Sequence, residues 1–566
     1  MTPVQLRQRY LIERKIPVDT ALYLKMLREI NLGATIDDAI VWDTARWRVT
    51  PGNLAELMVL AAMSDLRVPL YQLGDRLKDV DLSYLYDGAV TAEDINQYNM
   101  GEMLERLGTV HPEKIYEKIA LTALTTYHIE VERLHADTTS LSFWGAYEGT
   151  GENEGEVRIV RGYNKDGRPN CNQIVVGQIT NENGIVLEAR VMNGNTSDSE
   201  WNGYAIEHVK QIQQTLKTGA PLIADSKLIC QEHVKTLLAE NIRFISRCPA
   251  NYNQKLAARM IRQAYQPDRA WQDLGTFGQG KNASRYQGQL FQEQIEGKTV
   301  QLLVLQSSSL AGKAEESLVQ EQDELLTQAR ELQKKVFYCK ADVDEELNRF
   351  RKDARLVRYT DSWETAVSTI EHWPRGRRAK NSQPTSTTSQ YQLVFKALTA
   401  QADAVQQYRE DNSCLVLIAY VPESYGARDI LAAYKGQQEV ENSFRLLKTP
   451  AVASVIYLEN EQRIMGLTML LHVALLIRAL IQYRMRKGYA AWLDEHPGQH
   501  LAIGWANQKP KSLTYKMFFD HSRGIYYLWE TNGSFTLSYA SQENFDKIDS
   551  YLSLMGLGLQ DLLEKA

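Results

Sequence analysis

The chain has 566 residues, too many for one hydrophobic core, and this length predicts three or four domains. With 44% hydrophobic and 24% charged residues, the composition is that of a folded globular protein and excludes a largely disordered one. The net charge of −6 gives no general attraction to nucleic acid, so a nucleic-acid partner must be bound by local basic patches.

The cysteines are scattered along the chain and none forms a CxxC pair, which excludes a zinc ribbon and a disulfide framework and predicts reduced thiols. The first residues, MTPVQLRQRYLIERK, lack the apolar core of a signal peptide. We therefore expect a cytoplasmic protein.

Residues 1–120 are predicted to form a helical domain. LAELMVLAAM has apolar residues at helical spacing, and Asn53 with Glu56 indicates a capped start. The break DLRVP and the stretch LYQLGDRLKDV complete a helix–turn–helix outline. Two packed core helices are the commoner explanation of such an outline, although the surplus of Lys and Arg in the first 29 residues favours contact with DNA ends.

Residues 121–255 change to short β-rich runs: IEVERLHAD, EVRIVRGY, NQIVVGQIT and GIVLEARVM. Helical stretches then alternate with the short strands PLIAD and IRFISRC. Antiparallel strands followed by this alternation predict an α/β fold, with a mixed sheet flanked by helices.

Residues 256–425 form a region of different composition, in which strand-like pieces flank a long charged helical segment. We expect a mixed β/α insertion domain here. Its loop WPRGRRAKNSQPTSTTSQ carries four cations that either touch phosphates or belong to a solvated linker, and the sequence leaves both open. They are Arg375, Arg377, Arg378 and Lys380.

The α/β pattern returns at 426–490, where the apolar run Ile464 to Ile477 is too short for a membrane span and predicts a buried helix. Residues 491–566 are expected to be a helical C-terminal region, a candidate for dimer or DNA contacts. No membrane association and no small-molecule cofactor are predicted.

Two aspartates follow short apolar runs: Asp137 closes IEVERLHAD and Asp225 closes PLIAD. Catalytic groups collect at the carboxyl ends of strands in open sheets. Each aspartate also has a structural explanation, because Asp225 is well placed as a helix N-cap and Asp137 as a turn residue.

The stretch YKGQQEVENSFRLLK (residues 434–448, the signature segment) gives the third candidate carboxylate. At 100° per residue, five of its polar and aromatic side chains fall within an arc of about 80°. Ala433, Val440, Phe444 and Leu447 form an apolar stripe on another side of the helix. The helix can pack on a sheet through this stripe and still present the polar line along its flank. The five residues of the line are Tyr434, Gln437, Glu441, Arg445 and Lys448.

Taken together, Asp137, Asp225 and Glu441 are the kind of hard-oxygen donors that Mg²⁺ and Mn²⁺ prefer. Two such ions about 3.5–4 Å apart support phosphodiester displacement, and neighbouring cations hold the phosphate backbone in register. No Ser/His/Asp or Cys/His arrangement competes with this interpretation.

These residues resemble the DDE transposases of bacterial insertion sequences, in the branch whose third block carries a Tyr-x2-Arg-x3-Glu-x6-Lys signature. LHADTTSLSF, LIADSKL and the signature segment carry the resemblance, supported by GYNKDGRP, GNTSD and RIMGLTMLLHVALLIRALI. Tyr434, Glu441 and Lys448 match the signature spacing. The signature arginine is replaced by Gln437, so one phosphate contact of the branch is missing.

The resemblance implies a ribonuclease H-like catalytic fold interrupted by an insertion between Asp225 and Glu441. It implies that Asp137, Asp225 and Glu441 hold two Mg²⁺ or Mn²⁺ ions, and that Tyr434 and Lys448 help to hold the DNA ends. Gln437 and Arg445, on the same arc of the helix, complete the candidate nucleic-acid site, with Arg445 as a substitute for the missing arginine. The resemblance also implies a homodimer on double-stranded DNA, in the cytoplasm at the nucleoid.

The implied activity is cleavage at the ends of a transposable element, followed by joining of the freed 3′-OH to target DNA. A nuclease that cuts without joining, and an inactive relative kept for DNA binding, are the alternatives on the same fold. A hydrolase of small phosphoesters is disfavoured by the chain length and the basic segments.

Overall fold

The computed structural model describes most of the chain, and the structural statements below concern the described residues alone. These are residues 10–64, 72–143, 147, 157–278, 280, 283–373, 375–376, 382–436, 443–445, 447–448, 460–504, 510, 512–530 and 534–564. The chain divides into two compact units, the second of which is inserted into the first. The first comprises Met1–Leu228, Glu232–Phe244 and Ala433–Ala566, and the second comprises Ile229–Gln231 and Ile245–Ala432.

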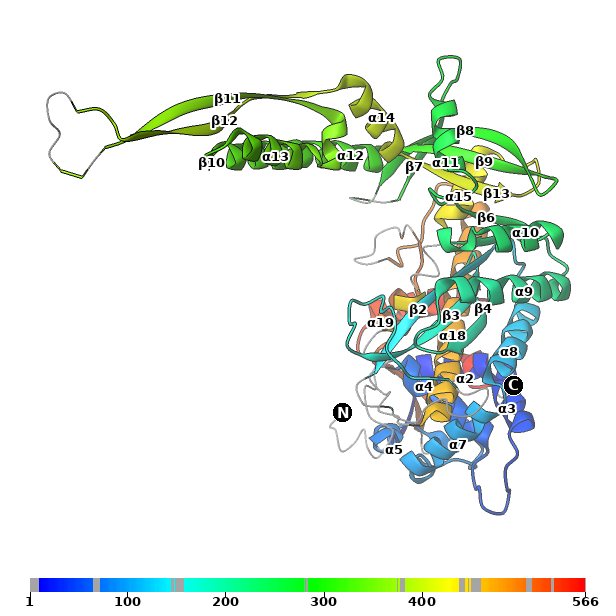
Figure 1. Ribbon diagram of the computed structural model, residues 1–566. Helices are drawn as coiled ribbons and strands as arrows, with labels where there is room; N and C mark the ends of the chain where they lie inside the picture. Colours follow the sequence, from blue (N-terminus) through cyan, green and yellow to red (C-terminus); the bar gives the residue numbers. More distant parts are fainter. Residues whose placement is uncertain are drawn as a thin grey trace. The chain divides into compact units, whose positions relative to one another are not determined.

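The described N-terminal part of the first unit is mainly helical (Figure 1). The N-cap of α4 is Thr50, three residues before the predicted cap Asn53. The Thr50 side chain accepts from the Asn53 amide, and Pro51 occupies the first helical position. Since α4 is buried on nearly all sides, it packs as a core helix. The helices are α2 (Val18–Glu29), α3 (Leu32–Ala39), α4 (Pro51–Met63), α5 (Leu73–Leu77), α6 (Leu82–Leu85), α7 (Gln97–Thr109) and α8 (Pro112–Thr126).

A small sheet that the sequence analysis did not predict joins the two ends of the first unit. β1 (Tyr10–Pro17) pairs antiparallel with β14 (Ile525–Glu530), which pairs in turn with β15 (Phe535–Tyr539). The C-terminal region therefore combines strands with the helices α19 (Tyr515–Ser522) and α20 (Gln542–Leu554) and is not purely helical.

The main sheet of the first unit has the strand order β4-β3-β2-β5, and β6, whose first residue closes this piece of the unit, is next to β5 in the order. β2, β3 and β4 run antiparallel, whereas β5 is parallel to β2, so the sheet is mixed as predicted. The segment EVRIVRGY, predicted as a strand, forms only an isolated bridge from Val160 to Gln173. The strands are β2 (Leu134–Phe143), β3 (Asn172–Asn181), β4 (Val186–Met192), β5 (Leu222–Ala224) and β6 (Phe244–Arg247).

Helices pack around this sheet. α18 (Glu461–Glu495) contacts α4, α7, α8, α20 and β4. It is apolar and long enough to cross a membrane by composition, yet 83% of its most apolar window is buried within the protein, in line with the buried helix predicted at Ile464 to Ile477. α9 (Asp198–Leu216) begins with a capping box at Ser197 and contacts β2, and α10 (Gln231–Ala239) follows β5.

The second unit contains the antiparallel strands β13-β9-β8-β7 and an arm, defined as residues 308–413. The insertion predicted at 256–425 lies within this unit. The bounds are α11 (Leu256–Ala264), β7 (Gln272–Phe277), β8 (Ser284–Ile295), β9 (Lys298–Ser307), β13 (Cys414–Tyr420) and, at the end of the unit, α15 (Ala427–Lys435).

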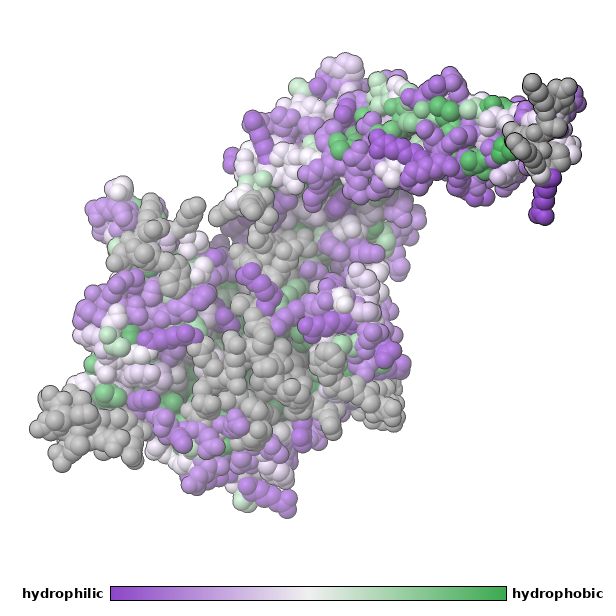
Figure 2. All heavy atoms as spheres, turned by 90° about the vertical axis from the view of Figure 1, so that its left-hand side faces the viewer, coloured by the Kyte–Doolittle hydropathy of each residue, from purple (hydrophilic) through white to green (hydrophobic). Residues whose placement is uncertain are grey.

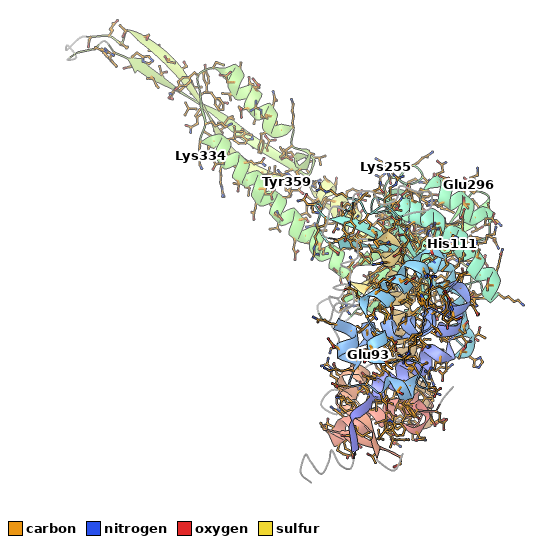
Figure 3. All side chains as sticks on the ribbon, turned by 90° about the horizontal axis from the view of Figure 1, so that it is seen from below. Glu93, His111, Lys255, Glu296, Lys334 and Tyr359 are labelled. Carbon is orange, nitrogen blue, oxygen red and sulfur yellow. The ribbon has the colours of Figure 1, made fainter. Side chains whose placement is uncertain are left out.

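In the arm, a two-stranded ribbon runs beside two helices (Figure 1), with Lys334 following the first helix and Tyr359 opening the ribbon (Figure 3). A core that includes Leu325, Val343 and Leu393 holds these elements together. The surface seen in Figure 2 is mainly hydrophilic with scattered apolar patches. The arm comprises α12 (Ser308–Gln333), β10 (Val336–Phe337), α13 (Lys340–Arg351), β11 (Tyr359–His372), β12 (Ser386–Ala400) and α14 (Ala402–Ser413).

Candidate active site

Asp137 and Asp225 are brought to the same level of the main sheet. β2 pairs with β5 in parallel, with Leu134 opposite Leu222 and His135 opposite Ile223. Continuing this register by two residues places Asp225, just beyond β5, level with Asp137. Neighbouring strands lie about 4.8 Å apart, and the Asp225 carboxylate is near enough to Asp137 to raise the pKa of that residue. Asp137 does not end its strand as predicted, because β2 continues through six more residues to Phe143.

Burial and mutual repulsion act on both aspartates. The pKa of Asp137 is raised to about 6, chiefly by burial and also by the carboxylates of Asp225 and Asp198, against the lowering effects of the Lys165 charge and a hydrogen bond from the Thr138 amide. Burial also raises the pKa of Asp225, although a hydrogen bond from the Lys227 amide opposes the rise. Groups that resist ionisation in this way favour a nearby positive charge.

Asp198 is a third carboxylate of the site and was not singled out from the sequence. It is the first residue of α9, and its Oδ1 accepts a hydrogen bond of 2.6 Å from Thr138 Oγ1. Burial alone would raise the pKa of Asp198, but the Thr138 hydrogen bond and the charge of Lys165 lower it below its ordinary value. We call Asp137, Asp198 and Asp225 the carboxylate cluster.

Lys165 is the second residue that the sequence analysis missed. Its Nζ lies 3.1 Å from Asp198 Oδ1 and 3.6 Å from Asp137 Oδ1, and it donates to both oxygens of Thr138. Lys165 and Asp198 lie in GYNKDGRP and GNTSD, two segments that the sequence analysis did quote. Their presence in those segments was the only indication of a role. Because the two residues are far apart in the chain, the sequence pattern does not predict their contact.

The signature segment is described in part. Tyr434 is half-buried near the end of α15, and Arg445 is exposed in a helical turn. Ala433, Phe444 and Leu447 are buried, which confirms the described part of the predicted apolar stripe. Gln437, Val440 and Glu441 lie outside the described residues.

Lys448 pairs with an acidic residue in this structure. Its Nζ lies 2.6 Å from Asp166 Oδ1, and Asp166 is the chain neighbour of Lys165. The loop carrying Lys165 therefore reaches both the carboxylate cluster and the end of the signature segment.

Two described residues that bracket Glu441 lie against the strands of the site. A Cβ at Gly436 would be 3.3 Å from Cε1 of His135, so the backbone passes close to β2 there. Ser443 Oγ donates to Gln178 Oε1 over 2.9 Å. Gln178 is paired with Asp137 across β2 and β3, and directly opposed residues project from the same face of a sheet. His135, two residues before Asp137, projects from that face as well.

Gln178 also links the signature segment to α18. His472 Nδ1 lies 2.6 Å from the Thr468 carbonyl, which can only accept, so Nδ1 carries the proton. His472 Nε2 then accepts from Gln178 Nε2 over 2.8 Å, and this orientation leaves Gln178 Oε1 free to accept from Ser443. Burial lowers the pKa of His472 to about 4, which keeps the ring neutral at pH 7.

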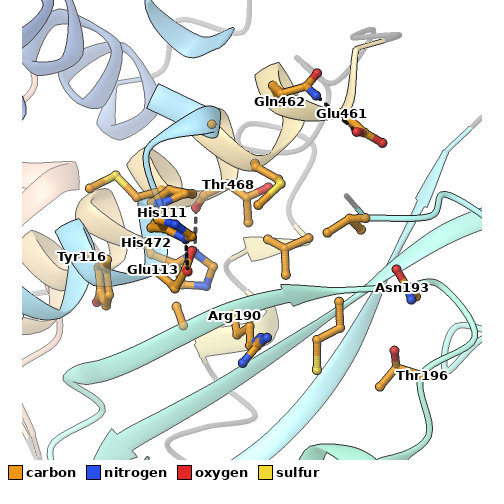
Figure 4. Close-up of a pocket in the computed structure, with 18 of the residues that line it drawn as sticks. His111, Glu113, Tyr116, Arg190, Asn193, Thr196, Glu461, Gln462, Thr468 and His472 are labelled. Atoms are coloured by element: carbon orange, nitrogen blue, oxygen red, sulfur yellow. Dashed lines mark hydrogen bonds and ion pairs between the residues drawn. The ribbon is translucent and has the colours of Figure 1, made fainter. Parts of the chain in front are cut away.

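A cavity of about 850 Å³ lies beside this hydrogen-bonded chain (Figure 4). His111, Glu113, Arg190, Glu461 and His472 line it, together with apolar methionines of α18. The lining mixes acidic, basic and apolar side chains and defines no single ligand class.

Among the described residues, no three His, Cys, Asp or Glu side chains are close enough together to hold a metal ion. Glu441, the predicted third ligand, lies outside these residues. The structure thus brings Asp137 and Asp225 together, adds Asp198 and Lys165, and leaves the complete triad as a prediction.

Residues 20–121 match the family model described as Domain of unknown function (DUF4277). No curated protein matches the chain. A similar solved structure is a piggyBac transposase synaptic complex with hairpin DNA, at 10% identity, covering 97% of this chain and 82% of that one. Its TM-score of 0.36 is too low to carry an inference about fold or function.

Proposed function

We propose that this chain is a DNA transposase that cleaves the ends of its own element and joins the freed 3′-OH to target DNA. The observation that carries the proposal is the convergence on one region of the main sheet. Asp137 on β2 and Asp225, just beyond the parallel strand β5, are level with each other. Gly436 and Ser443, the described residues on either side of Glu441 in the chain, lie against His135 and Gln178, the sheet neighbours of Asp137.

We propose a ribonuclease H-like fold for the catalytic part of the first unit. Counted along the chain from β2, the sheet order is 3-2-1-4-5, with the first three strands antiparallel and the fourth parallel to the first. The first aspartate on the central strand and the second at the end of the adjacent parallel strand support this assignment.

The donor chemistry of the carboxylate cluster fits divalent cations. Its oxygens are hard donors, their mutual repulsion is only partly compensated, and an ammonium group already lies among them. Asp137, Asp225 and Glu441 would hold two Mg²⁺ or Mn²⁺ ions. When bound, these ions would supply charge neutralisation and activation of oxygen nucleophiles for phosphodiester cleavage and transfer.

The other residues of the site would position DNA. Arg445 is exposed and Lys448 needs only to exchange Asp166 for a phosphate, so both can contact the backbone of an element end. Tyr434 and Gln437 extend the same face of the signature segment in the sequence pattern. We further propose that the protein acts as a homodimer on double-stranded DNA, in the cytoplasm at the nucleoid.

The proposal is tested with labelled element ends and a target plasmid. Asp137→Asn, Asp225→Asn and Glu441→Gln should each reduce Mg²⁺-dependent end cleavage by about 10²-fold or more, because each removes a negative ligand. End binding in Ca²⁺ should survive. Glu207→Gln, on the exposed side of α9, is the matched control and should cleave like the wild type.

The same assay separates the alternatives. Wild-type protein that cuts ends but never joins them to plasmid is a nuclease, and wild-type protein that binds without cutting is an inactive relative. Full activity in any one of the three variants removes that residue from the proposed triad.

A further inference from the structure

The ammonium group of Lys165 lies in a cage of oxygens. Its Nζ is 2.7 Å from Thr138 Oγ1, 2.9 Å from the Thr138 carbonyl, 3.1 Å from Asp198 Oδ1 and 3.6 Å from Asp137 Oδ1. Two carboxylates, a hydroxyl and a carbonyl are the ligand types that proteins offer to hard cations. A lysine side chain thus occupies a place with the chemistry of a cation site.

The backbone that carries Lys165 is fixed independently of this cage. The side-chain nitrogen of Asn164, Nδ2, donates to Ser142 Oγ over 2.9 Å and to Gln173 Oε1 over 2.8 Å. Asn164 Oδ1 accepts from the backbone amides of Asp166 and Arg168, and Gly167 turns the loop at a φ of 71°. Because the loop is held by these bonds, the ammonium can leave the cage by a change of side-chain rotamer alone.

We propose that Lys165 is the resident counter-cation of the carboxylate cluster. In the metal-free protein its ammonium lies between Asp137 and Asp198, and a divalent cation that binds Asp137 competes with it for that carboxylate. This inference rests on the metal site of the proposed function. Lys165 thereby sets the strength of metal binding. When no metal is present, its positive charge partly neutralises the negative charge of the carboxylate cluster.

Loss of the Lys165 ammonium changes metal affinity in opposite directions for a competing role and for a purely structural role. A lysine that only holds Asp137 and Asp198 in place helps a metal to bind, so its loss weakens metal binding. A lysine that competes with the metal opposes binding, so its loss strengthens it. Truncating the ammonium therefore distinguishes the two roles by the sign of the change.

The test is Mn²⁺ binding by the full chain without DNA, with free Mn²⁺ followed by electron paramagnetic resonance. In Lys165→Met the dissociation constant should fall about 10- to 100-fold, the equivalent of one charge-assisted hydrogen bond. The metal-free variant should also unfold at a lower temperature than the wild type, because the repelling carboxylates lose their partner. Lys165→Arg keeps the charge and should bind Mn²⁺ no more tightly than the wild type.

Lys227→Met is the matched control. Lys227 is exposed and its charge acts on Asp198, but no described bond places its ammonium in the cage. It should change the dissociation constant much less than Lys165→Met. Circular dichroism of each variant checks that the fold is intact, and Lys165→Gln replaces the Met variant if that protein does not fold.

An unchanged or weaker affinity in the folded Lys165 variant overturns the inference, as does an equal gain in Lys227→Met or an absence of Mn²⁺ binding in every protein. The strand-transfer assay of the wild type is a separate readout. If joining fails while Lys165→Met binds Mn²⁺ more tightly, the inference stands and the proposed function falls.

Discussion

Lys448 and Asp166 form an ion pair. If DNA binds at the signature segment, Lys448 must leave Asp166 in order to contact a phosphate. Their atoms are 2.6 Å apart and both side chains are partly exposed. Lys448→Met should weaken binding of element ends and reduce the salt slope, log K against log salt, by about 1 in magnitude. Asp166→Asn should strengthen binding at low salt, because Lys448 loses a competing carboxylate and the DNA loses a repelling one.

Both effects are measured by fluorescence anisotropy of a labelled end at several salt concentrations. Lys210→Met on α9 is a suitable control, since Lys210 pairs with Glu240 in a similar surface ion pair. An unchanged slope in Lys448→Met removes this residue from the DNA contacts.

Glu56 gives a prediction about pH and stability. Burial raises its pKa from 4.5 to about 7, and the charge of Arg28 opposes the rise only in part. The folded chain therefore holds a proton that the unfolded chain has lost between pH 4.5 and 7, so stability falls as the pH rises through this window. The shift corresponds to about 3 kcal/mol of unfolding free energy. Glu56→Gln should recover up to that amount at pH 8 and little at pH 4.

Thermal unfolding at the two pH values measures the difference. Glu93, labelled in Figure 3, is exposed, and Glu93→Gln should leave both melting temperatures unchanged. A gain in Glu56→Gln that is equal at pH 4 and pH 8 would show that ionisation is not its source.

At the scale of elements, α7 and α18 cross at two glycines. A Cβ at Gly108 would lie 2.0 Å from the Gln462 carbonyl oxygen, and one at Gly466 would lie 2.3 Å from the Leu104 carbonyl oxygen. Each helix thus presents a glycine to the backbone of the other. This crossing helps to fix α18, whose His472 holds Gln178 beside the site.

Gly466→Ala should therefore destabilise the protein by about 1–3 kcal/mol, the usual cost of overpacking. Gly312 in α12 has open space around it, and Gly312→Ala should be neutral or gain about 0.5–1 kcal/mol from helix propensity. Urea unfolding followed by circular dichroism compares the two. Equal destabilisation by both substitutions would contradict the close-approach argument.

Local patterns predicted β5 well and β2 less well. PLIAD is a short apolar run with a turn residue after it, so both the strand and the place of Asp225 were predictable. β2 continues through Thr138, Thr139 and Ser140, whose polar side chains are buried. Because hydrophobicity marks buried positions only when they are apolar, the sequence pattern predicts a strand end at Asp137.

The C-terminal strands illustrate a different limit. IYYLWE and FTLSY have strong β character, but β14 also pairs with β1, about 500 residues earlier in the chain. Pairing over such a distance leaves no local pattern. The meeting of Lys165 with Asp198, and of Lys448 with Asp166, is hidden for the same reason.

At the scale of the whole molecule, the outer part of the arm can be removed without opening its core. Val367 in β11 is paired with Tyr391 in β12, so residues 368–390 can be replaced by a two-residue Asn-Gly turn. This truncation keeps the pairing of β10 with Tyr391 and Gln392. It removes Arg375 together with the basic residues at 377, 378 and 380.

The truncated protein should keep the melting temperature of the wild type, because the residues removed in β11 are exposed on both faces. If the four cations contact phosphates, the salt slope of DNA binding should fall by as much as about 3 to 4. Anisotropy against an element end measures the slope. Wild-type salt dependence in the truncated chain would assign the basic loop to solvent.

Because the second unit is inserted between Phe244 and Ala433, the residues of the candidate active site are synthesised in two stages. Asp137, Asp198 and Asp225 leave the ribosome before the insertion, and the signature segment leaves after it. At about 5–20 residues per second, the delay is roughly 10–40 s. The delay is longer still for β1, because its pairing partner β14 is synthesised near the end of translation. Under the proposed function, a nascent chain therefore carries only part of the candidate active site, and DNA cleavage must await the finished protein.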